Sequence, residues 1–429
     1  MTRTSVLDSV QGKSPFTIHN LPYGVITTAD NPERRCATAF RDDAIDLAIV
    51  HGDGLFQDIP GLEANVFASD TLNIFAALPH ETRQKVRGRL IEAVETKSIS
   101  AAAVFPLSDV QNHFPMATGN FSDFFCSWEH TVNSTEVMLG KPTFMPNWSV
   151  IPTVYNGRTS SLAISGTPIT RPCGVFPQVS GEAQKGEVQF QPEGEFDFEL
   201  EMGVFLSKPV PRGRRPDMAS IKEHIFGFVL LNDWSARNIQ QFESPFLGPF
   251  HAKGSGTSIS PWIVALEALD RVVCPRASVQ SPAPLRHLQC PEETEATFDI
   301  HVFAKVLRNG TQYLFTEANL NELHWTPFQQ LVHLGSAGEG LSTGDIFGTG
   351  TISSSRTNSS GEKTGLGCIL ERKLRRNKLS SLPDDIAETF LLDGDEVVLE
   401  GWCIDRETSE VILGFGQCRG KVMPAYRSE

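Results

Sequence analysis

The chain has 429 residues, of which 40% are hydrophobic and 21% are charged, and its formal net charge is −14. This length exceeds a usual single core, so we expect a soluble globular protein of two domains. The negative charge argues against nucleic acid or an anionic membrane surface as a partner, and every apolar run is shorter than the ~20 residues of a membrane span.

The cysteines and the first residues indicate the compartment. Eight cysteines are scattered along the chain without C-x-x-C spacing. This pattern is typical of reduced thiols rather than of a disulfide framework or a zinc site. The chain also begins without the apolar core of a signal peptide. We therefore expect a cytoplasmic protein.

The first hundred or so residues predict a small β-rich domain. Segments 22–26 and 44–50 are rich in β-branched and aromatic residues and lie between turn-forming residues, so they predict short strands. Capping residues at 69–71 precede a short helical segment. Residues 81–95 carry apolar side chains at helical spacing and predict an amphipathic helix.

A polar, turn-rich stretch separates this part from the rest, so we predict domains at 1–118 and 119–429. Short Val/Ile/Phe-rich segments alternate with Gly and Pro in the second domain, which is therefore expected to be mostly β. Within it, the serine-rich segment 353–363 predicts a mobile loop, either a lid or an insertion. The basic cluster 372–378 predicts a solvated hairpin without a nucleic-acid role.

The second domain opens with an acid and a histidine, Asp123 and His130, seven positions apart. A lone histidine is more often structural than catalytic, so this spacing leaves the role of His130 open. Between them, Cys126 is interpreted as a small buried thiol rather than a nucleophile.

Residues 196–202 read F-D-F-E-L-E-M. In a strand, Asp197, Glu199 and Glu201 would share one face, opposite the apolar side chains. If that face is sheltered, the mutual repulsion of its carboxylates is best relieved by a bound cation with oxygen ligands, namely Mg²⁺, Ca²⁺ or Mn²⁺. The alternative is a half-exposed strand whose polar side is wet.

A second constellation follows the apolar run 225–231, which predicts a buried strand ending at Asp233. Asp233, Arg237 and Gln240 stand at i, i+4 and i+7, so they would share one face if the segment were helical. The alternative is a surface helix with one weak ion pair. The downstream glycine loop 253–257 supplies a cation and hydroxyl groups but matches no nucleotide-binding spacing.

Many ordered segments of this chain resemble the fumarylacetoacetase family, along nearly its whole length. The matching segments are 20–25, 145–148, 155–158, 165–169, 199–202, 232–237, 247–250, 260–262, 350–353 and 414–418. The resemblance implies a mostly β (α+β) fold, with an N-terminal SH3-like barrel at 1–118 and a C-terminal mixed β-sandwich roll at 119–429. It also implies a homodimer, a hydrolase acting on a 1,3-diketo acid, and a place in tyrosine degradation.

The resemblance assigns roles to individual residues. It implies a metal ion, Mg²⁺ or Ca²⁺, in a site formed by Asp123, Glu199, Glu201 and Asp233, with Lys253 and Thr257 beside it. His130 corresponds to the general base, oriented by Glu371. Groups that polarise the substrate carbonyl correspond to Arg237, Gln240 and Lys253. Substrate contacts correspond to Phe125, Tyr155, Ser244 and Thr351.

The implied chemistry needs these residue types. Water must attack a carbonyl carbon, and the leaving carbanion is tolerable only as an enolate whose oxygen sits near positive charge. A neutral histidine held by a carboxylate is a suitable base for water near pH 7. A divalent ion would also keep clustered carboxylates ionised.

The chain departs from the family pattern where the substrate would be gripped. The positions of Phe125 and Ser244 are usually tyrosines, and an arginine expected about nine residues after His130 is missing, with only Lys141 nearby. Lysine does not replace the bidentate grip of arginine. We therefore predict a retained hydrolytic centre with a different substrate, a β-diketone or an acylpyruvate-like compound with a less anionic end.

Two alternatives remain at this stage. The same scaffold could decarboxylate or isomerise a β-keto acid, in which case loss of His130 would have a weak effect. The chain could also be a non-catalytic binder that keeps the metal site for stability, in which case loss of His130 would change nothing.

Overall fold

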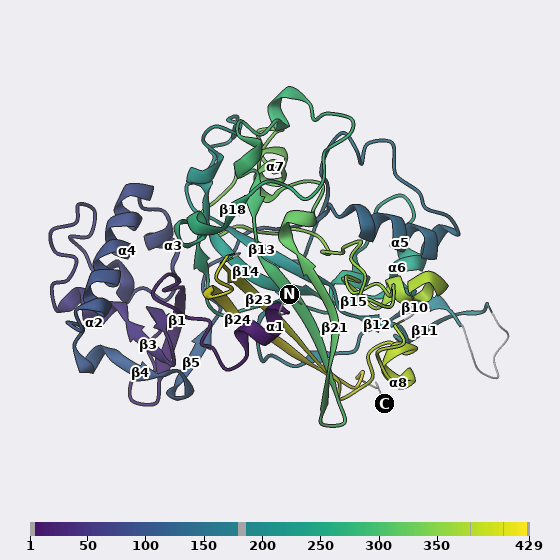
Figure 1. Ribbon diagram of the computed structural model, residues 1–429, viewed down its shortest axis with the longest axis horizontal. Coiled ribbons are helices and arrows are strands. Elements are labelled where there is room, and N and C mark those ends of the chain that lie inside the picture. The colour runs from purple at the N-terminus through teal and green to yellow at the C-terminus, as the bar shows by residue number, and fades with distance from the viewer. Residues whose placement is uncertain (1–4, 179–185, 378, 406, 427–429) are drawn as a thin grey trace.

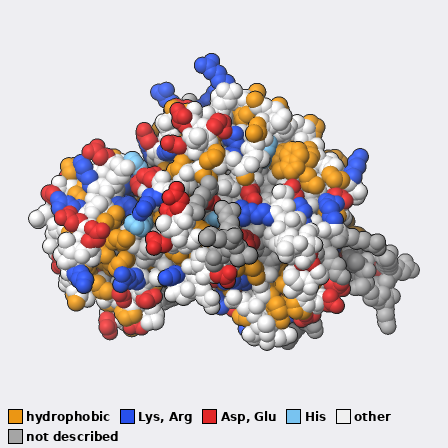
Figure 2. Space-filling model, viewed as in Figure 1, with side chains coloured by type: hydrophobic (Ala, Val, Ile, Leu, Met, Phe, Trp, Pro, Cys, Tyr) orange, Lys and Arg blue, Asp and Glu red, His pale blue; other side chains and the backbone are white. Residues whose placement is uncertain are grey.

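The computed structural model describes residues 5–178, 186–377, 379–405 and 407–426. Its strands outnumber its helices in the described part of the chain, and the helices lie outside the sheets (Figure 1), which confirms the mostly β (α+β) prediction. Charged side chains of both signs are spread over the face shown in Figure 2. No helix among the described residues combines the length and hydrophobicity that crossing a membrane requires.

The N-terminal part forms a five-stranded antiparallel sheet with strand order β4-β3-β2-β1-β5. Its strands are β1 (Tyr23–Thr28), β2 (Arg35–Phe40), β3 (Asp43–Asp46), β4 (Val104–Pro106) and β5 (Val110–His113), and its helices are α2 (Leu47–Gly52), α3 (Asn73–Ala76) and α4 (His80–Glu95). The predicted helix at 81–95 is thus confirmed as α4. The SH3-like description of this sheet stays a prediction, as do the proposed domain limits.

The predicted strand at 44–50 is wrong in its second half. Strand β3 ends at Asp46, and the chain enters α2 at Leu47. The Asp46 carboxylate accepts hydrogen bonds from the backbone N–H groups of Ala48 (2.9 Å) and Ile49 (3.2 Å). These bonds satisfy two orphan donors at the helix start, and this capping outweighs the β-propensity of the apolar run.

An eight-stranded sheet forms the centre of the molecule, with strand order β7-β6-β22-β13-β14-β16-β8 and β17 also paired to β14. Its strands are β6 (Phe121–Phe125), β7 (Thr153–Asn156), β8 (Leu162–Ile164), β13 (Leu200–Leu206), β14 (Ile225–Asp233), β16 (Thr257–Ile259), β17 (Val264–Ala265) and β22 (Ile346–Gly348). Residues distant in sequence therefore meet on adjacent strands of one sheet.

A second sheet, ordered β21-β20-β23-β24-β9, packs against the central one. Its strands are β9 (Ile169–Thr170), β20 (His301–Arg308), β21 (Thr311–Asn319), β23 (Glu396–Ile404) and β24 (Val411–Met423). One apolar core contains Val204 and Leu230 of the central sheet together with Val302 and Leu399 of the second. The paired, buried faces of these two sheets form the main core of the protein.

The remaining elements are short. They are the strand pairs β10 (Cys173–Pro177) with β11 (Val188–Pro192), β12 (Phe196–Asp197) with β15 (Ser235–Ala236) and β18 (Val273–Cys274) with β19 (Thr297–Phe298), and the helices α1 (Val6–Val10), α5 (Trp128–Leu139), α6 (Arg237–Glu243), α7 (Pro327–Leu334) and α8 (Asp384–Ala387). Helices α5 and α6 lie near each other at the end of the molecule far from the N-terminal sheet (Figure 1).

The segment after β14 also differs from its prediction. Asp233 is the last residue of β14, and helix α6 begins only at Arg237, so these two residues do not share a helix face. The predicted buried strand ending at Asp233 is confirmed, because every residue of β14 is buried. The helical spacing failed because strand pairing continues to the end of β14, where Asp233 pairs with Thr257 of β16.

The basic cluster is not a solvated hairpin. It contains two 3₁₀ helices, η11 (Leu370–Lys373) and η12 (Arg375–Asn377), and Lys378 lies outside the described residues. Arg372 donates hydrogen bonds to the carbonyl oxygens of Ile386 and Thr389, both at 2.5 Å. The cluster is therefore tied to the protein by backbone acceptors that sequence spacing does not reveal. No disulfide joins the cysteines of the described residues.

Candidate active site

Four carboxylates meet at the centre of the large sheet. Asp123 lies on β6, Glu201 on β13 and Asp233 at the end of β14, while Glu199 immediately precedes β13. One oxygen of each lies within 4.8 Å of one from each of the others, and all four side chains are buried. The wet-strand alternative is thereby excluded, because the polar face of residues 197–201 is covered.

Two cations contact this acidic cluster. Lys253 donates hydrogen bonds to Glu199 and, at 2.7 Å, to Asp233. Arg237 bonds Glu199 at 2.8 Å and also Asp197, which lies outside the cluster. Two positive charges beside this many carboxylates leave the site with excess negative charge.

Burial and mutual repulsion raise the pKa of two of these acids, whereas neighbouring cations lower the pKa of a third. Burial, and then the charge of Asp233, raises the pKa of Asp123. Burial, and then Asp123, raises the pKa of Glu201. Although burial also acts on Glu199, the neighbouring Lys253 and Arg237 hold its pKa below the usual range. The side of the cluster that contains Asp123 and Glu201 is therefore the side that lacks positive charge.

The residues present fit a hard divalent cation. Asp123 Oδ1 and Glu201 Oε1 are buried and have no hydrogen-bond partner. Both carboxylates face Gly348, where an added Cβ would lie 2.5 Å from Asp123 Oδ1 and 2.7 Å from Glu201 Oε2. An all-oxygen set of carboxylates with unpaired, buried atoms suits Mg²⁺ or Ca²⁺ rather than a soft metal.

Tyr155 and Thr257 complete the surroundings of the cluster. The Tyr155 hydroxyl lies 2.8 Å from both Asp123 Oδ2 and Asp233 Oδ2, and Thr257 donates to Asp233 Oδ1 at 2.8 Å. Burial, and then Asp123, raises the pKa of Tyr155. The predicted metal-site roles of Lys253 and Thr257 stay predictions, and the structure places both in hydrogen-bond contact with Asp233.

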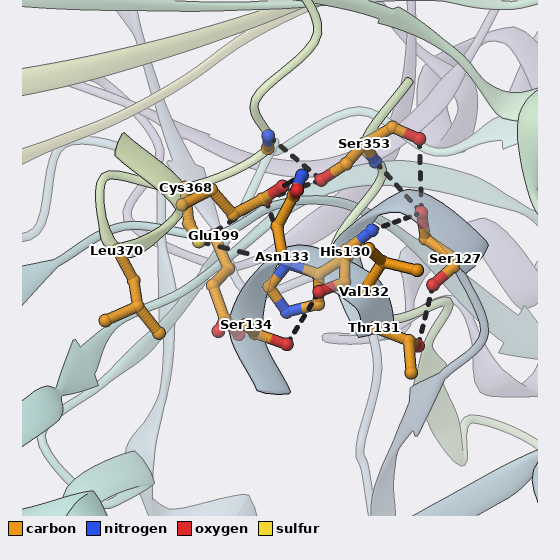
Figure 3. A network of polar contacts seen from close by, with 12 residues as sticks. Ser127, His130, Thr131, Val132, Asn133, Ser134, Glu199, Ser353, Cys368 and Leu370 are labelled. Carbon is orange, nitrogen blue, oxygen red and sulfur yellow. Dashed lines mark hydrogen bonds and ion pairs between the residues drawn. The ribbon is translucent and has the colours of Figure 1, made fainter. Parts of the chain in front are cut away.

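His130 lies close to Glu199 of the acidic cluster (Figure 3) and pairs with another glutamate, Glu371. His130 is in the first turn of α5, whose N-cap is Ser127, and its Nδ1 lies 2.9 Å from Glu371 Oε1 on η11. Glu371 also accepts hydrogen bonds from Asn133 Nδ2 (2.7 Å) and Ser353 Oγ (2.6 Å). Burial alone would raise the pKa of Glu371, but the nearby His130 lowers it below its usual range. A carboxylate on Nδ1 leaves Nε2 as the basic nitrogen of His130.

The sequence analysis missed Asn133 and Ser353, which hold Glu371. Asn133 lies three residues after His130, so the helical spacing of α5 could have suggested it. Ser353 belongs to the serine-rich segment predicted to be a mobile loop, yet Ser353 and Ser354 are buried. The missed Cys368 thiol also approaches this pair, 3.6 Å from Glu371 Oε1.

A cavity of about 780 Å³ is lined by His130 and by two acids of the cluster, Asp123 and Glu199. The predicted residues that line it are Asp123, Phe125, His130, Tyr155, Glu199, Arg237, Gln240, Ser244, Lys253 and Thr351. Gln240 accepts a hydrogen bond from Arg237 at 3.0 Å. The Phe125 ring meets the His130 ring edge to face, with 5.3 Å between centroids. Lys141, exposed to solvent, is not among the lining residues.

Comparison with known proteins agrees with this geometry. Residues 19–115 match the family model described as "Fumarylacetoacetase N-terminal" and residues 121–423 match "Fumarylacetoacetate (FAA) hydrolase C-terminal". The chain is 37% identical to the fumarylacetoacetase of Caenorhabditis elegans, covering 97% of this chain and 98% of that protein. It is 36% identical to that of Homo sapiens, covering 96% and 97%.

Among solved structures, the fumarylacetoacetate hydrolase of Exiguobacterium antarcticum has a TM-score of 0.51 and 16% identity, covering 94% of this chain and 99% of that one. This likeness supports the fold. The family matches and the near-full-length relatives show that the chain belongs to the fumarylacetoacetase family. It is an enzyme, a hydrolase that acts on carbon–carbon bonds in ketonic substrates.

Proposed function

We propose that this enzyme is a metal-dependent hydrolase that cleaves a 1,3-diketone with water activated by His130. The observation that carries the proposal is one cavity lined by His130, which pairs with Glu371, and by Asp123 and Glu199 of the acidic cluster. A base and a cation-binding site facing one space are what attack by water and enolate departure require.

His130 Nε2 takes a proton from water as the water oxygen bonds to a carbonyl carbon. Glu371 accepts a hydrogen bond from the Nδ1–H group of His130, which fixes the tautomer and stabilises the imidazolium that forms. The bond between that carbon and the central CH₂ then breaks, and its electron pair remains on the departing fragment as an enolate. Return of the proton to the CH₂ carbon gives a carboxylic acid and a methyl ketone.

The divalent ion would be held by the four acids of the cluster, Asp123, Glu199, Glu201 and Asp233. When bound, a divalent cation supplies positive charge for the developing enolate oxygen. Arg237, Gln240 and Lys253 line the same region of the cavity and polarise the substrate carbonyl. Tyr155 and Thr351 also line it, as substrate contacts would.

The cavity differs from the family pattern at the positions expected to hold the substrate. Phe125 and Ser244 line the cavity without the phenolic hydroxyls of tyrosine, and Lys141 is not among the lining residues. This supports a β-diketone with a less anionic end. A homodimer and a bound Mg²⁺ or Ca²⁺ ion are parts of the same proposal, and they are supported by the family resemblance. A cytoplasmic location is supported by the scattered cysteines without C-x-x-C spacing.

The test uses His130→Ala with His333→Ala as the control, because His333 lies on α7 and is not among the residues lining the cavity. Hydrolysis of 1,3-diketones is measured after removal of metal by a chelator and after return of Mg²⁺ or Ca²⁺. We expect chelation to abolish turnover, and His130→Ala to lower kcat by about 10²- to 10⁴-fold.

Two results would contradict the proposal. A weak effect of His130→Ala together with release of CO₂ or an isomer would favour a decarboxylase or isomerase. Absence of turnover on every 1,3-diketone by the metal-loaded protein, with wild type and His130→Ala alike, would favour a non-catalytic binder.

A further inference from the structure

The cavity has an inner end at the acidic cluster and an outer end at its mouth. The arginine and lysine side chains that line it among the described residues are Arg237 and Lys253. Both belong to the inner end, and both are already paired, with Asp197, Glu199 and Asp233. A carboxylate at the outer end would therefore meet no lysine or arginine among the described lining residues.

Part of the hydrogen-bonding capacity of the wall is used by the protein itself. Five threonine and serine side chains that line the cavity donate to backbone carbonyl oxygens. The donor–acceptor pairs are Thr131 with Ser127, Ser134 with His130, Thr135 with Thr131, Thr143 with Lys141, and Thr153 with Phe125. Since a hydroxyl has one proton, these groups offer carbon atoms and acceptor lone pairs to a ligand. The donors left on the wall, such as Asn147, Gln241 and Ser244, are neutral, so a carboxylate there would gain no opposite charge.

Apolar side chains also line the outer end. We call the outer compartment the space lined by Phe125, Met138, Leu139, Met145, Val154 and Phe246. These residues come from β6, α5, β7 and the segments at 143–148 and 244–250. At the mouth, Leu139 and Met145 each keep 53% of their surface exposed. A hydrocarbon guest would cover this surface.

We propose that the substrate carries an uncharged hydrocarbon acyl tail, alkyl or aryl, which occupies the outer compartment. This inference rests on the proposed function, since it places the 1,3-dicarbonyl end of the molecule at His130 and the acidic cluster. Each methylene buried in the outer compartment strengthens binding by about fourfold. A second carboxylate in the same place loses hydration without gaining a positively charged partner.

A matched set of three substrates tests the tail alone. They are 3,5-dioxodecanoate with a hexanoyl tail, 3,5-dioxohexanoate with an acetyl tail, and fumarylacetoacetate with an anionic tail. All keep the same acetoacetate end. In 3,5-dioxodecanoate, the OH of water joins the C5 carbonyl carbon, the C4–C5 bond breaks with its electron pair on C4, and C4 takes the remaining proton, giving hexanoate and acetoacetate.

We expect kcat/KM for 3,5-dioxodecanoate to exceed that for fumarylacetoacetate by at least about tenfold, and to exceed that for 3,5-dioxohexanoate as well. A value for fumarylacetoacetate equal to or above that for 3,5-dioxodecanoate would overturn the inference. Equal turnover of all three would overturn the inference while leaving the proposed function standing. Failure to hydrolyse any of them in the presence of metal would instead remove the proposed function.

Variants at Leu139 test whether missing charge is the cause. Leu139→Arg places a cation at the last turn of α5, where a positive charge is favourable for the helix, and Leu139→Gln is the uncharged control of similar length. We expect Leu139→Arg, and not Leu139→Gln, to raise the ratio of kcat/KM for fumarylacetoacetate to that for 3,5-dioxodecanoate by about tenfold. Equal ratios in the two variants would overturn the assignment of the outer compartment as the selective element.

Discussion

Replacing Glu371 by glutamine isolates the role of one charge, because the change keeps almost the same volume. Glu371 is fully buried and accepts hydrogen bonds from His130, Ser353 and Asn133, and the Cys368 thiol lies 3.6 Å from its Oε1. A glutamine amide has one acceptor oxygen and one NH₂ group. If its oxygen faces His130 and Ser353, its NH₂ group meets the NH₂ group of Asn133. Turning Asn133 to relieve this contact would sacrifice its 3.2 Å bond to Arg376.

The kinetic cost follows from the charge on the imidazole. During water activation His130 becomes an imidazolium, and in Glu371→Gln it would do so in a buried site without its counter-charge. We expect kcat to fall by about 10²- to 10⁴-fold, which corresponds to about 3–5.5 kcal/mol of transition-state stabilisation. The unpaired donor should also lower the free energy of unfolding by about 1–3 kcal/mol.

The assay measures kcat, metal affinity by calorimetry, and the free energy of unfolding. Glu136→Gln is the matched control. Glu136 also lies on α5, but it pairs with Arg376 at the surface and does not line the cavity. We expect Glu136→Gln to keep the wild-type kcat and both variants to keep metal affinity. If Glu371→Gln retained kcat within about threefold of wild type at full metal loading, the dyad would not act as the base.

Two further predictions concern the metal site and acid stability. Gly348→Ala should weaken metal affinity by at least about tenfold, because its Cβ would displace Asp123 and Glu201. Gly52→Ala is the control, because the added atom there has open space around it and affinity should not change. Equal affinities of the two variants by calorimetry would count against the site. Burial lowers the pKa of His324 to about 4, so protonation of this side chain favours the unfolded chain. The free energy of unfolding should therefore be constant above about pH 6.5 and fall by up to about 3 kcal/mol as the pH approaches 4. His324→Phe should flatten this dependence in denaturant titrations, and an unchanged slope would refute the assignment.

Some features were decided by the sequence because they depend on local chemistry. The apolar spacing of residues 81–95 specified helix α4, and the apolar run ending at Asp233 specified β14. The alternation at 196–202 predicted that Asp197, Glu199 and Glu201 would share one face. Glu199 and Glu201 belong to the buried cluster, whereas Asp197, on the separate strand β12, pairs with Arg237 outside it. These predictions succeeded because side-chain periodicity is fixed by the backbone geometry of each element.

Other features were set only by the tertiary structure. Asp123 and Glu201 meet because β22 inserts between β6 and β13, and no pattern in the chain reveals that strand order. The pairing of His130 with Glu371 spans 241 positions, and Ser353, from a segment predicted to be mobile, completes it from inside. The commitment of the wall hydroxyls to backbone carbonyls likewise depends on atomic contacts rather than on residue type. A linear sequence specifies which groups are available, whereas their distances depend on how distant segments pack, and charge and hydrogen-bond energies change steeply with those distances.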